Sequence, residues 1–158
     1  MKTVLIYTTM HGTTEKVAHY IAGQLADVTV IKLSNSSDIP ISSFDRVILG
    51  GSIHMENVQS SVKKFCVKHR EELLSKPLAL FVCGMEKEPG KQDEELRLAF
   101  PEEINQHAQA KAFVGGEFLF EKMNFIQRMI IKKIAHADVS QSDIKYDVVN
   151  SFISAIKL

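Results

Sequence analysis

The chain of 158 residues has no tryptophan, only two cysteines, and no apolar run that approaches the length of a membrane span. A helix that crosses a bilayer needs about 20 consecutive apolar residues. Cys66 and Cys83 form neither a CxxC motif nor a zinc-ligand pattern, and two cysteines cannot hold a scaffold of this size together. These absences argue against a disulfide-rich secreted protein and a membrane-spanning one, and a reducing cytoplasm is the simplest setting.

The sequence also carries no net charge at pH 7. Lysine and arginine total 19, aspartate and glutamate total 19, and the formal charge at pH 7 is zero with histidine neutral. A nucleic-acid-binding domain usually carries a basic excess, and a disordered chain combines high net charge with low hydrophobicity. With 45% hydrophobic residues, the composition instead predicts one ordinary globular domain over residues 1–158, with no nucleic acid as partner.

Short apolar runs alternate along the chain with segments whose apolar residues recur at helical spacing. The predicted strands cover residues 3–7, 28–31, 46–49, 78–82 and 112–114, and the predicted helices about 17–27, 58–69, 96–104 and 148–156. This order predicts βαβ units, and therefore an α/β fold with a parallel sheet between two layers of helices. Because ligands of such sheets bind outside the carboxyl ends of the strands, the loops after the first, third and fourth strands form the candidate site.

The loop after the first strand reads Thr8-Thr9-Met10-His11-Gly12-Thr13-Thr14-Glu15 and leads into a helix. Threonine hydroxyls and the backbone N–H groups of a helix N-terminus can hold a phosphate, and the helix dipole favours its charge. The loop matches neither GxxxxGK[ST] nor GxGxxG, and without a lysine it suits a monophosphate better than a metal-bound triphosphate. From these residues alone, Thr13 or Thr14 acting only as a helix cap is an equal alternative.

Three segments together resemble one family. The first loop, with the aromatic Tyr7 before it, resembles the FMN-phosphate loop (S/T)xxGxTE of flavodoxins. Gly50-Gly51-Ser52-Ile53-His54 resembles that family's second loop, and Phe81-Val82-Cys83-Gly84-Met85 its third. The order and spacing of all three match over essentially the whole chain. The resemblance implies a flavodoxin-like three-layer fold, with a five-stranded parallel sheet of order 2-1-3-4-5, and FMN as cofactor.

The resemblance also implies which residues contact the cofactor. The phosphate would lie against the first loop, and the ring would lie between the other two. The implied binding residues are Thr9, Met10, His11, Gly12, Thr13, Thr14, Gly51, Ser52, Ile53, His54, Cys83, Gly84 and Met85. The cofactor would carry the redox chemistry, so no catalytic side chain is assigned, and the histidines share no metal-ligand spacing.

The chain departs from electron-transfer flavodoxins in two respects. Those proteins usually flank the ring with tryptophan and tyrosine and are strongly acidic, whereas here His54, Met55 and Met85 would have to cover the ring. Between the fifth strand and the last helix lies an extra segment at about residues 117–137, whose stretch 118–136 mixes apolar and basic residues. That stretch resembles its counterpart in the flavodoxin-type, menaquinone-dependent protoporphyrinogen oxidases, as do residues 45–53.

This similarity implies an FMN-dependent oxidoreductase that passes electrons from a reduced substrate, such as a tetrapyrrole, through FMN to a quinone-like acceptor. The alternative is a flavodoxin that serves a redox partner as a non-enzymatic electron-transfer protein. Two interpretations of residues 118–136 stay open. One is a basic amphipathic helix that is in peripheral contact with the inner face of the membrane or shapes a pocket for a large apolar substrate, and the other is a helix packed on the sheet. A phospho-receiver domain is disfavoured, because Thr8-Thr9 and Gly50-Gly51 stand where it needs acidic residues.

Overall fold

The computed structural model describes residues 1–9, 12–34, 38–54, 57–58, 60–118, 129 and 141–158. Its central sheet has five parallel strands: β1 (Thr3–Tyr7), β2 (Val28–Lys32), β3 (Arg46–His54), β5 (Leu78–Cys83) and β6 (Ala110–Phe113). They lie in the order β2-β1-β3-β5-β6, which is 2-1-3-4-5 for the parallel strands in chain order, as predicted. The short β4 (Asn57–Val58) pairs antiparallel with the end of β3.

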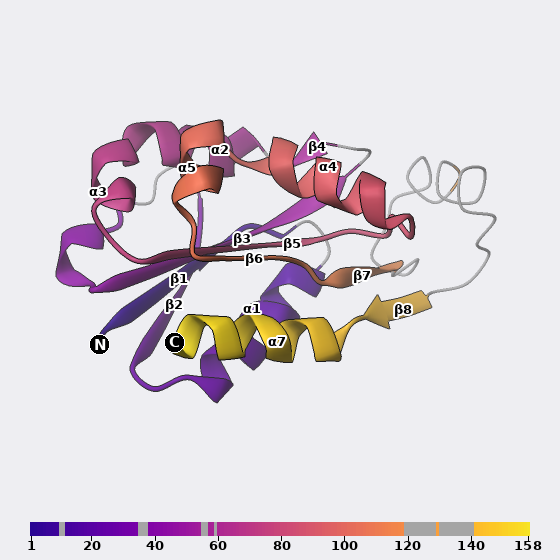
Figure 1. The fold of residues 1–158 in the computed structure, drawn as a ribbon, viewed down its shortest axis with the longest axis horizontal. Coiled ribbons are helices and arrows are strands. Elements are labelled where there is room, and N and C mark those ends of the chain that lie inside the picture. Colours follow the sequence, from indigo (N-terminus) through magenta and orange to yellow (C-terminus); the bar gives the residue numbers. More distant parts are fainter. Residues whose placement is uncertain (10–11, 35–37, 55–56, 59, 119–128, 130–140) are drawn as a thin grey trace.

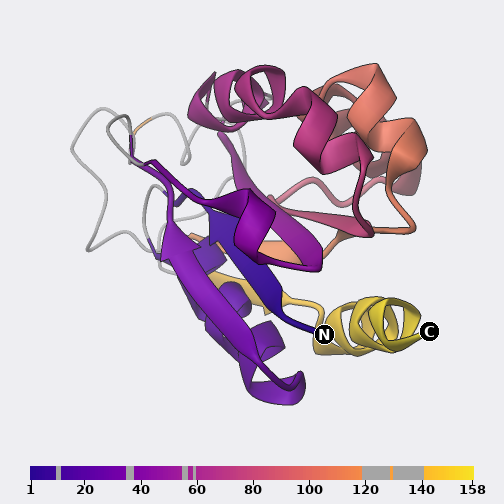
Figure 2. The same cartoon turned by 90° about the vertical axis from the view of Figure 1, so that its left-hand side faces the viewer.

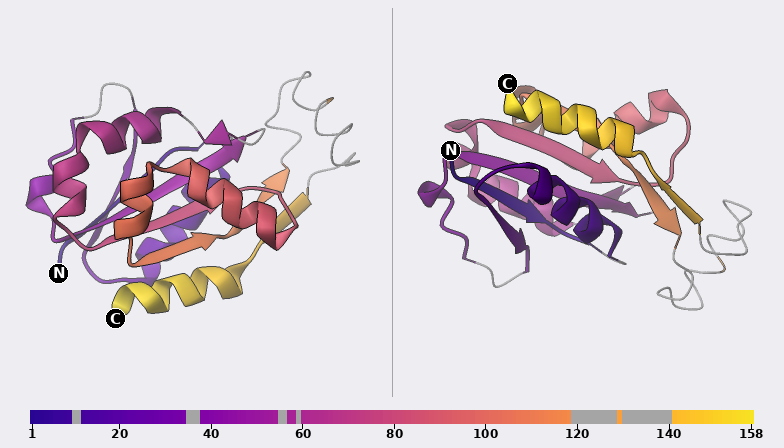
Figure 3. Two further views of the ribbon diagram at one scale, coloured as in Figure 1. Left: turned by 45° about the horizontal axis from the view of Figure 1, so that its top comes forward. Right: turned by 90° about the horizontal axis from the view of Figure 1, so that it is seen from below.

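Helices cover both faces of this sheet (Figure 1). On one face lie α1 (Thr13–Gln24) and α7 (Tyr146–Lys157). On the other lie α2 (Ser60–Lys68), α3 (Arg70–Leu74), α4 (Pro89–Ala99) and α5 (Glu102–His107), and Figure 3 shows each layer from its own side. A 3-10 turn, η1 (Ile41–Ser43), precedes β3. The predicted three-layer α/β fold is confirmed.

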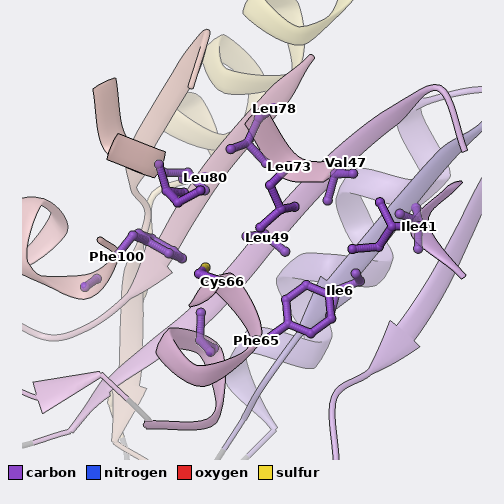
Figure 4. Packing of buried hydrophobic residues seen from close by; sticks show 14 of the residues in the cluster. Ile6, Ile41, Val47, Leu49, Phe65, Cys66, Leu73, Leu78, Leu80 and Phe100 are labelled. Atoms are coloured by element: carbon purple, nitrogen blue, oxygen red, sulfur yellow. The ribbon is translucent and has the colours of Figure 1, made fainter. Parts of the chain in front are cut away.

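Alternate side chains of the central strands enter two hydrophobic cores. Every residue of β1 and of β5 is buried, as expected for parallel strands covered on both faces. Val4 and Ile6 of β1 point into the core beneath α2–α5, which Figure 4 shows from close by, while Leu5 and Tyr7 point into the core beneath α1 and α7. The helical stripe predicted near the C-terminus forms the buried face of α7: Val149, Phe152, Ile153 and Ile156.

One predicted helix is two helices in the structure. The pattern at 96–104 divides into the end of α4 and the start of α5, because Phe100 takes an extended conformation before Pro101, as residues before proline usually do. The Asn105 side-chain amide stabilises the break by donating to the carbonyl oxygens of Arg97 at 2.8 Å and Phe100 at 3.0 Å. These bonds satisfy carbonyls that the end of a helix leaves without partners.

The chain after β6 forms a second, two-stranded sheet that the sequence did not predict. β7 (Gly115–Phe118) pairs antiparallel with β8 (Gln141–Ile144), and we call this pair the β7–β8 ribbon. The extra segment predicted at about 117–137 begins within β7. Residues 119–128 and 130–140 lie outside the described residues, as does the helix predicted there, so the segment's conformation and the single-domain assignment stay predictions. No helix among the described residues is long and apolar enough to span a membrane.

Different segments of the chain lie at the amino and the carboxyl ends of the parallel strands. Figures 1 and 2 show the N- and C-termini near the amino ends of the strands, while the β7–β8 ribbon lies at the opposite edge. At the amino end, the Arg46 guanidinium donates to the Thr3 hydroxyl at 3.0 Å and to the Ile156 carbonyl oxygen at 2.7 Å, which ties the end of α7 to the sheet. Ligands of parallel α/β sheets bind beyond the carboxyl ends of the strands, so the candidate site lies at the carboxyl edge.

Close packing in the middle of the sheet can be tested by substituting a glycine. A Cβ atom on Gly50 of β3 would lie 2.2 Å from the Phe81 ring, which is fully buried and cannot move aside, whereas a Cβ on Gly23 of α1 would meet nothing within 4 Å. We expect Gly50→Ala to lower the free energy of unfolding by about 1–3 kcal/mol. Gly23→Ala, the matched control, should raise it by about 0.5–1 kcal/mol through helix propensity. Urea denaturation measures both, and equal effects would contradict the packing.

Candidate functional site

The parallel register brings the predicted loops together at the carboxyl edge. Tyr7 and Phe81 each lie opposite Gly50, and Cys83 lies opposite Ser52, so β1, β3 and β5 end side by side. The Thr8 N–H also donates to the Gly50 carbonyl oxygen at 3.0 Å. The loops after these three strands are therefore neighbours, as the sequence predicted from the positions of the strand ends.

A fourth segment, which sequence reasoning did not assign, joins this edge. The Gly84 N–H donates to the Gly115 carbonyl oxygen at 2.9 Å, and a Cβ on Gly116 would lie 2.9 Å from the Gly84 carbonyl oxygen. β7 thus starts directly against the loop after β5, and only residues without side chains fit at this contact.

The first loop leads into α1 through a left-handed glycine. Gly12 has φ 94°, a conformation that costs glycine little. Its N–H donates to the Thr9 hydroxyl oxygen at 2.9 Å, and its carbonyl oxygen accepts from the Lys16 N–H at 3.0 Å. Gly12 is the cap residue and has no side chain with which to cap the helix, so Thr13 and Thr14 are its first two residues. The alternative in which either threonine serves only as the cap is therefore wrong.

Two hydroxyls beside this loop are buried with no oxygen or nitrogen partner among the residues that the structure describes. Thr14 is fully buried and Thr8 is 3% exposed, and the one polar group described beside the Thr14 hydroxyl is the weakly polar thiol of Cys83. A buried hydroxyl left unpaired costs about 1–3 kcal/mol, so the two are suited to meet a polar ligand. Hydroxyls of this kind beside a helix N-terminus are the donors that an oxyanion requires. Met10 and His11, also predicted here, lie outside the described residues.

The other two predicted loops are small and mainly apolar. Gly51 is buried, and Ser52, Ile53 and Met85 are half-buried. The backbone of His54 ends β3, but its side chain lies outside the described part of the structure, as does Met55.

Cys83 and Gly84 stand at the end of β5. Cys83 is 2% exposed, and burial raises the pKa of its thiol to about 12, which the nearby Thr14 hydroxyl opposes and the charge of Glu117 reinforces. The thiol therefore stays protonated at neutral pH and acts as a small apolar group. Gly84 is enclosed, since a Cβ there would lie 2.9 Å from the Phe113 ring.

Tyr7 and Glu15 join the end of β1 to α1. The Tyr7 hydroxyl donates to Glu15 Oε1 at 2.8 Å. Burial, together with this hydrogen bond and the carboxylate charge, raises the pKa of Tyr7 to about 12. The helix dipole alone accounts for an acidic residue in the first turn, but the structure gives Glu15 this specific partner as well.

Glu117 of β7 is the residue of the site that sequence reasoning missed. Its side chain is 4% exposed, and its carboxylate accepts from Lys16 Nζ at 2.8 and 3.1 Å, from the Ser142 hydroxyl at 2.8 Å and from the Thr13 hydroxyl at 3.3 Å. Burial raises the pKa of Glu117, but the bonds from Lys16, Ser142 and Thr13 outweigh burial and hold it below its ordinary value. The only signal in the sequence was its position just after the fifth strand.

The charged stretch after Met85 lies on the surface. The Glu86 carboxylate accepts the N–H groups of Lys87 and Glu88 at 3.2 and 3.1 Å and so organises the turn before α4. The Glu94–Arg97 pair on α4 is exposed as well. Among the residues that the structure describes, no three histidine, cysteine or acidic side chains gather into a metal site.

Comparison with known sequences gives one family. A sequence model of the flavodoxin domain matches residues 4–145. The protoporphyrinogen IX dehydrogenase (quinone) of Escherichia coli strain K12 is 23% identical, and the alignment covers 94% of this chain and 87% of that protein. The enzyme of the same name from Leishmania major is also 23% identical, over 99% of this chain and 71% of that protein.

Solved structures agree on the fold. The oxidised flavodoxin 1 of Bacillus cereus superimposes with a TM-score of 0.52 at 17% identity, covering 99% of this chain and 97% of that one. The WrbA-like flavodoxin of Agrobacterium tumefaciens gives a TM-score of 0.57 at 17% identity, covering 99% and 93%. The predicted resemblance is confirmed, and FMN, the predicted cofactor, is the cofactor of this family.

The Tyr7–Glu15 contact predicts a pH dependence of stability. Tyrosine in an unfolded chain loses its proton near pH ~10, whereas folded Tyr7 keeps it until about 12. Between these values the folded state holds the extra proton, so Tyr7 should make stability fall as pH rises through this window. We expect the urea midpoint of the wild type to fall more steeply than that of Tyr7→Phe. Parallel curves would show that Tyr7 ionises like an exposed tyrosine.

Proposed function

Since the chain belongs to the flavodoxin family, we propose that it binds FMN and acts as an oxidoreductase, passing electrons from a reduced substrate to a quinone-like acceptor. The observation that carries the cofactor proposal is the Thr14 hydroxyl in the first turn of α1, which is fully buried and has no oxygen or nitrogen partner among the described residues. A phosphate at this helix N-terminus would supply the missing acceptor and would meet the positive end of the helix dipole.

The phosphate would be held by the loop between β1 and α1. Its residues are Thr9, Met10, His11, Gly12, Thr13 and Thr14. Among the described members, Thr14 offers its hydroxyl and the start of α1 offers backbone N–H groups, and the left-handed Gly12 turns the chain so that the helix can start directly after the loop. The donors are neutral, which suits a monoester phosphate held without a metal ion.

The flavin ring would lie between Gly51-Ser52-Ile53-His54 and Cys83-Gly84-Met85. FMN supplies the redox chemistry by accepting and giving electrons at its ring system. The chain contributes shape and an apolar surface: the half-buried Ile53 and Met85 can exclude water, and the protonated thiol of Cys83 brings no charge. No ionised side chain of the described residues in these two loops is available as an acid or base, so their proposed role is binding and orientation.

A tetrapyrrole substrate and a quinone acceptor are supported by the relatives, which are quinone-dependent protoporphyrinogen dehydrogenases at 23% identity. Residues 118–136 would serve this function by bringing the chain to the inner face of the membrane, where lipid-soluble quinones are found. Their sequence combines apolar residues with Lys122, Arg128, Lys132 and Lys133, as a peripheral membrane segment requires.

An electron carrier is the competing function, and the charge balance weighs against it. Carriers of this fold find basic partners through a strongly acidic surface, because complementary charge steers the encounter. Here 19 basic residues match 19 acidic ones.

Anaerobic turnover separates the two functions. Protein reconstituted with FMN should oxidise protoporphyrinogen IX with menadione as acceptor, and protein stripped of FMN should not. If the reconstituted protein fails to turn over but is rapidly reduced in one-electron steps by a flavodoxin reductase, it is a carrier. A protein that remains colourless after incubation with FMN would contradict the whole proposal.

Thr14 offers a sharper test of the cofactor site. Thr14→Val removes a hydroxyl that, among the described residues, has only the weakly polar thiol of Cys83 beside it, so the protein without flavin should be about as stable as the wild type. FMN affinity should nevertheless fall by roughly tenfold, the loss expected for one hydrogen bond to a charged group. Thr29→Val, at an exposed position of β2, is the matched control and should leave FMN affinity unchanged. Fluorescence titration and thermal unfolding measure the two quantities, and unchanged FMN affinity in Thr14→Val would argue against a phosphate there.

A further inference from the structure

Glu117 holds an unusual position at this edge. Its carboxylate is almost fully enclosed and accepts from Thr13, the first residue of α1, and from Lys16 one turn later. On its other side it accepts from Ser142 of β8. A negative charge therefore lies against the same helix start that would receive the negatively charged phosphate.

Lys16 carries the positive charge that balances the carboxylate of Glu117. It is the one lysine or arginine between Tyr7 and Gln24, and its ammonium group lies 2.8 and 3.1 Å from the two oxygens of Glu117. The hydrogen bond to Glu117 raises the pKa of Lys16, so the pair stays doubly ionised at neutral pH. A lysine in the first turn of a phosphate-binding helix would by itself attract the phosphate, but here its charge is already satisfied.

We propose that the Glu117–Lys16 pair sets the charge that the flavin phosphate meets. Glu117 binds Lys16 and so leaves the phosphate to neutral donors, which limits FMN affinity and keeps it nearly independent of salt. Lys16 in turn screens the phosphate from the carboxylate. This inference rests on the proposed FMN site and adds to it a pair of residues outside the loop motif.

The proposal requires opposite effects from the two residues. Without the Glu117 charge, Lys16 is free to attract the phosphate, and affinity rises. Without Lys16, a bare carboxylate faces the phosphate, and affinity falls. If the pair only held the β7–β8 ribbon against α1, loss of either residue would weaken binding of any flavin.

The experiment compares FMN with riboflavin, which has the ring but no phosphate. Glu117→Gln keeps the size of the side chain and should bind FMN about tenfold more tightly at low ionic strength, with the gain lost at high salt. Lys16→Met should bind FMN about tenfold more weakly. The double variant, with neither charge, should lie within about twofold of the wild type, and riboflavin affinity should change by less than about twofold throughout.

Matched controls remove the same charges elsewhere. Lys91→Met changes the exposed Lys91–Glu88 pair at the start of α4, and Glu103→Gln changes the exposed pair of Glu103 on α5 with Arg70 on α3. Both variants should bind FMN as the wild type does. Weaker binding of both flavins by Glu117→Gln and Lys16→Met, or FMN affinity that does not respond to either, would overturn the charge proposal. Lys16 is half exposed, so Lys16→Met keeps the test valid even if Glu117→Gln folds poorly. A wild type that binds riboflavin and FMN equally would instead refute the phosphate site itself.

Discussion

Everything at the candidate site depends on the in-register pairing of β1, β3 and β5. This pairing places Tyr7, Gly50 and Phe81 in one row across the sheet, close to the carboxyl ends of the three strands. The row closes only because residue 50 has no side chain, since the Phe81 ring occupies the space that a Cβ would take. A bulkier residue there would separate the strand ends, and with them the loops proposed to hold the phosphate and the ring.

The β7–β8 ribbon adds a second constraint on the same edge. Gly115 has φ 81°, and a Cβ there would lie 2.0 Å from the Asp143 carbonyl oxygen, while Gly116 passes close to the backbone of Gly84. Because residues 115 and 116 have no side chains, β7 can pass close to the loop after β5 and continue towards α1. Glu117 reaches Lys16 and Thr13 as a result, so the proposed ring end and phosphate end of the site are connected through one short strand.

Local patterns were sufficient to predict the five parallel strands, the α/β class and three of the four segments at the site. Buried strands appear as apolar runs, and the first loop carries its own hydroxyls and Gly12. The division between α4 and α5 was missed, although Pro101 was a signal for it, because a residue before proline favours an extended conformation. The strand β8 could not be predicted, because its four residues have no apolar alternation and pair with β7 across more than twenty intervening positions.

Composition and local patterns were enough to predict the buried strands, the polar loop after the first of them and the balance of charges. Which of these charges meet depends on the tertiary structure. Lys16 and Glu117 are 101 positions apart, and nothing in either neighbourhood identifies the other. Their pairing follows from the path of β7 across the carboxyl edge, because an ion pair between distant residues depends on the whole chain being in place.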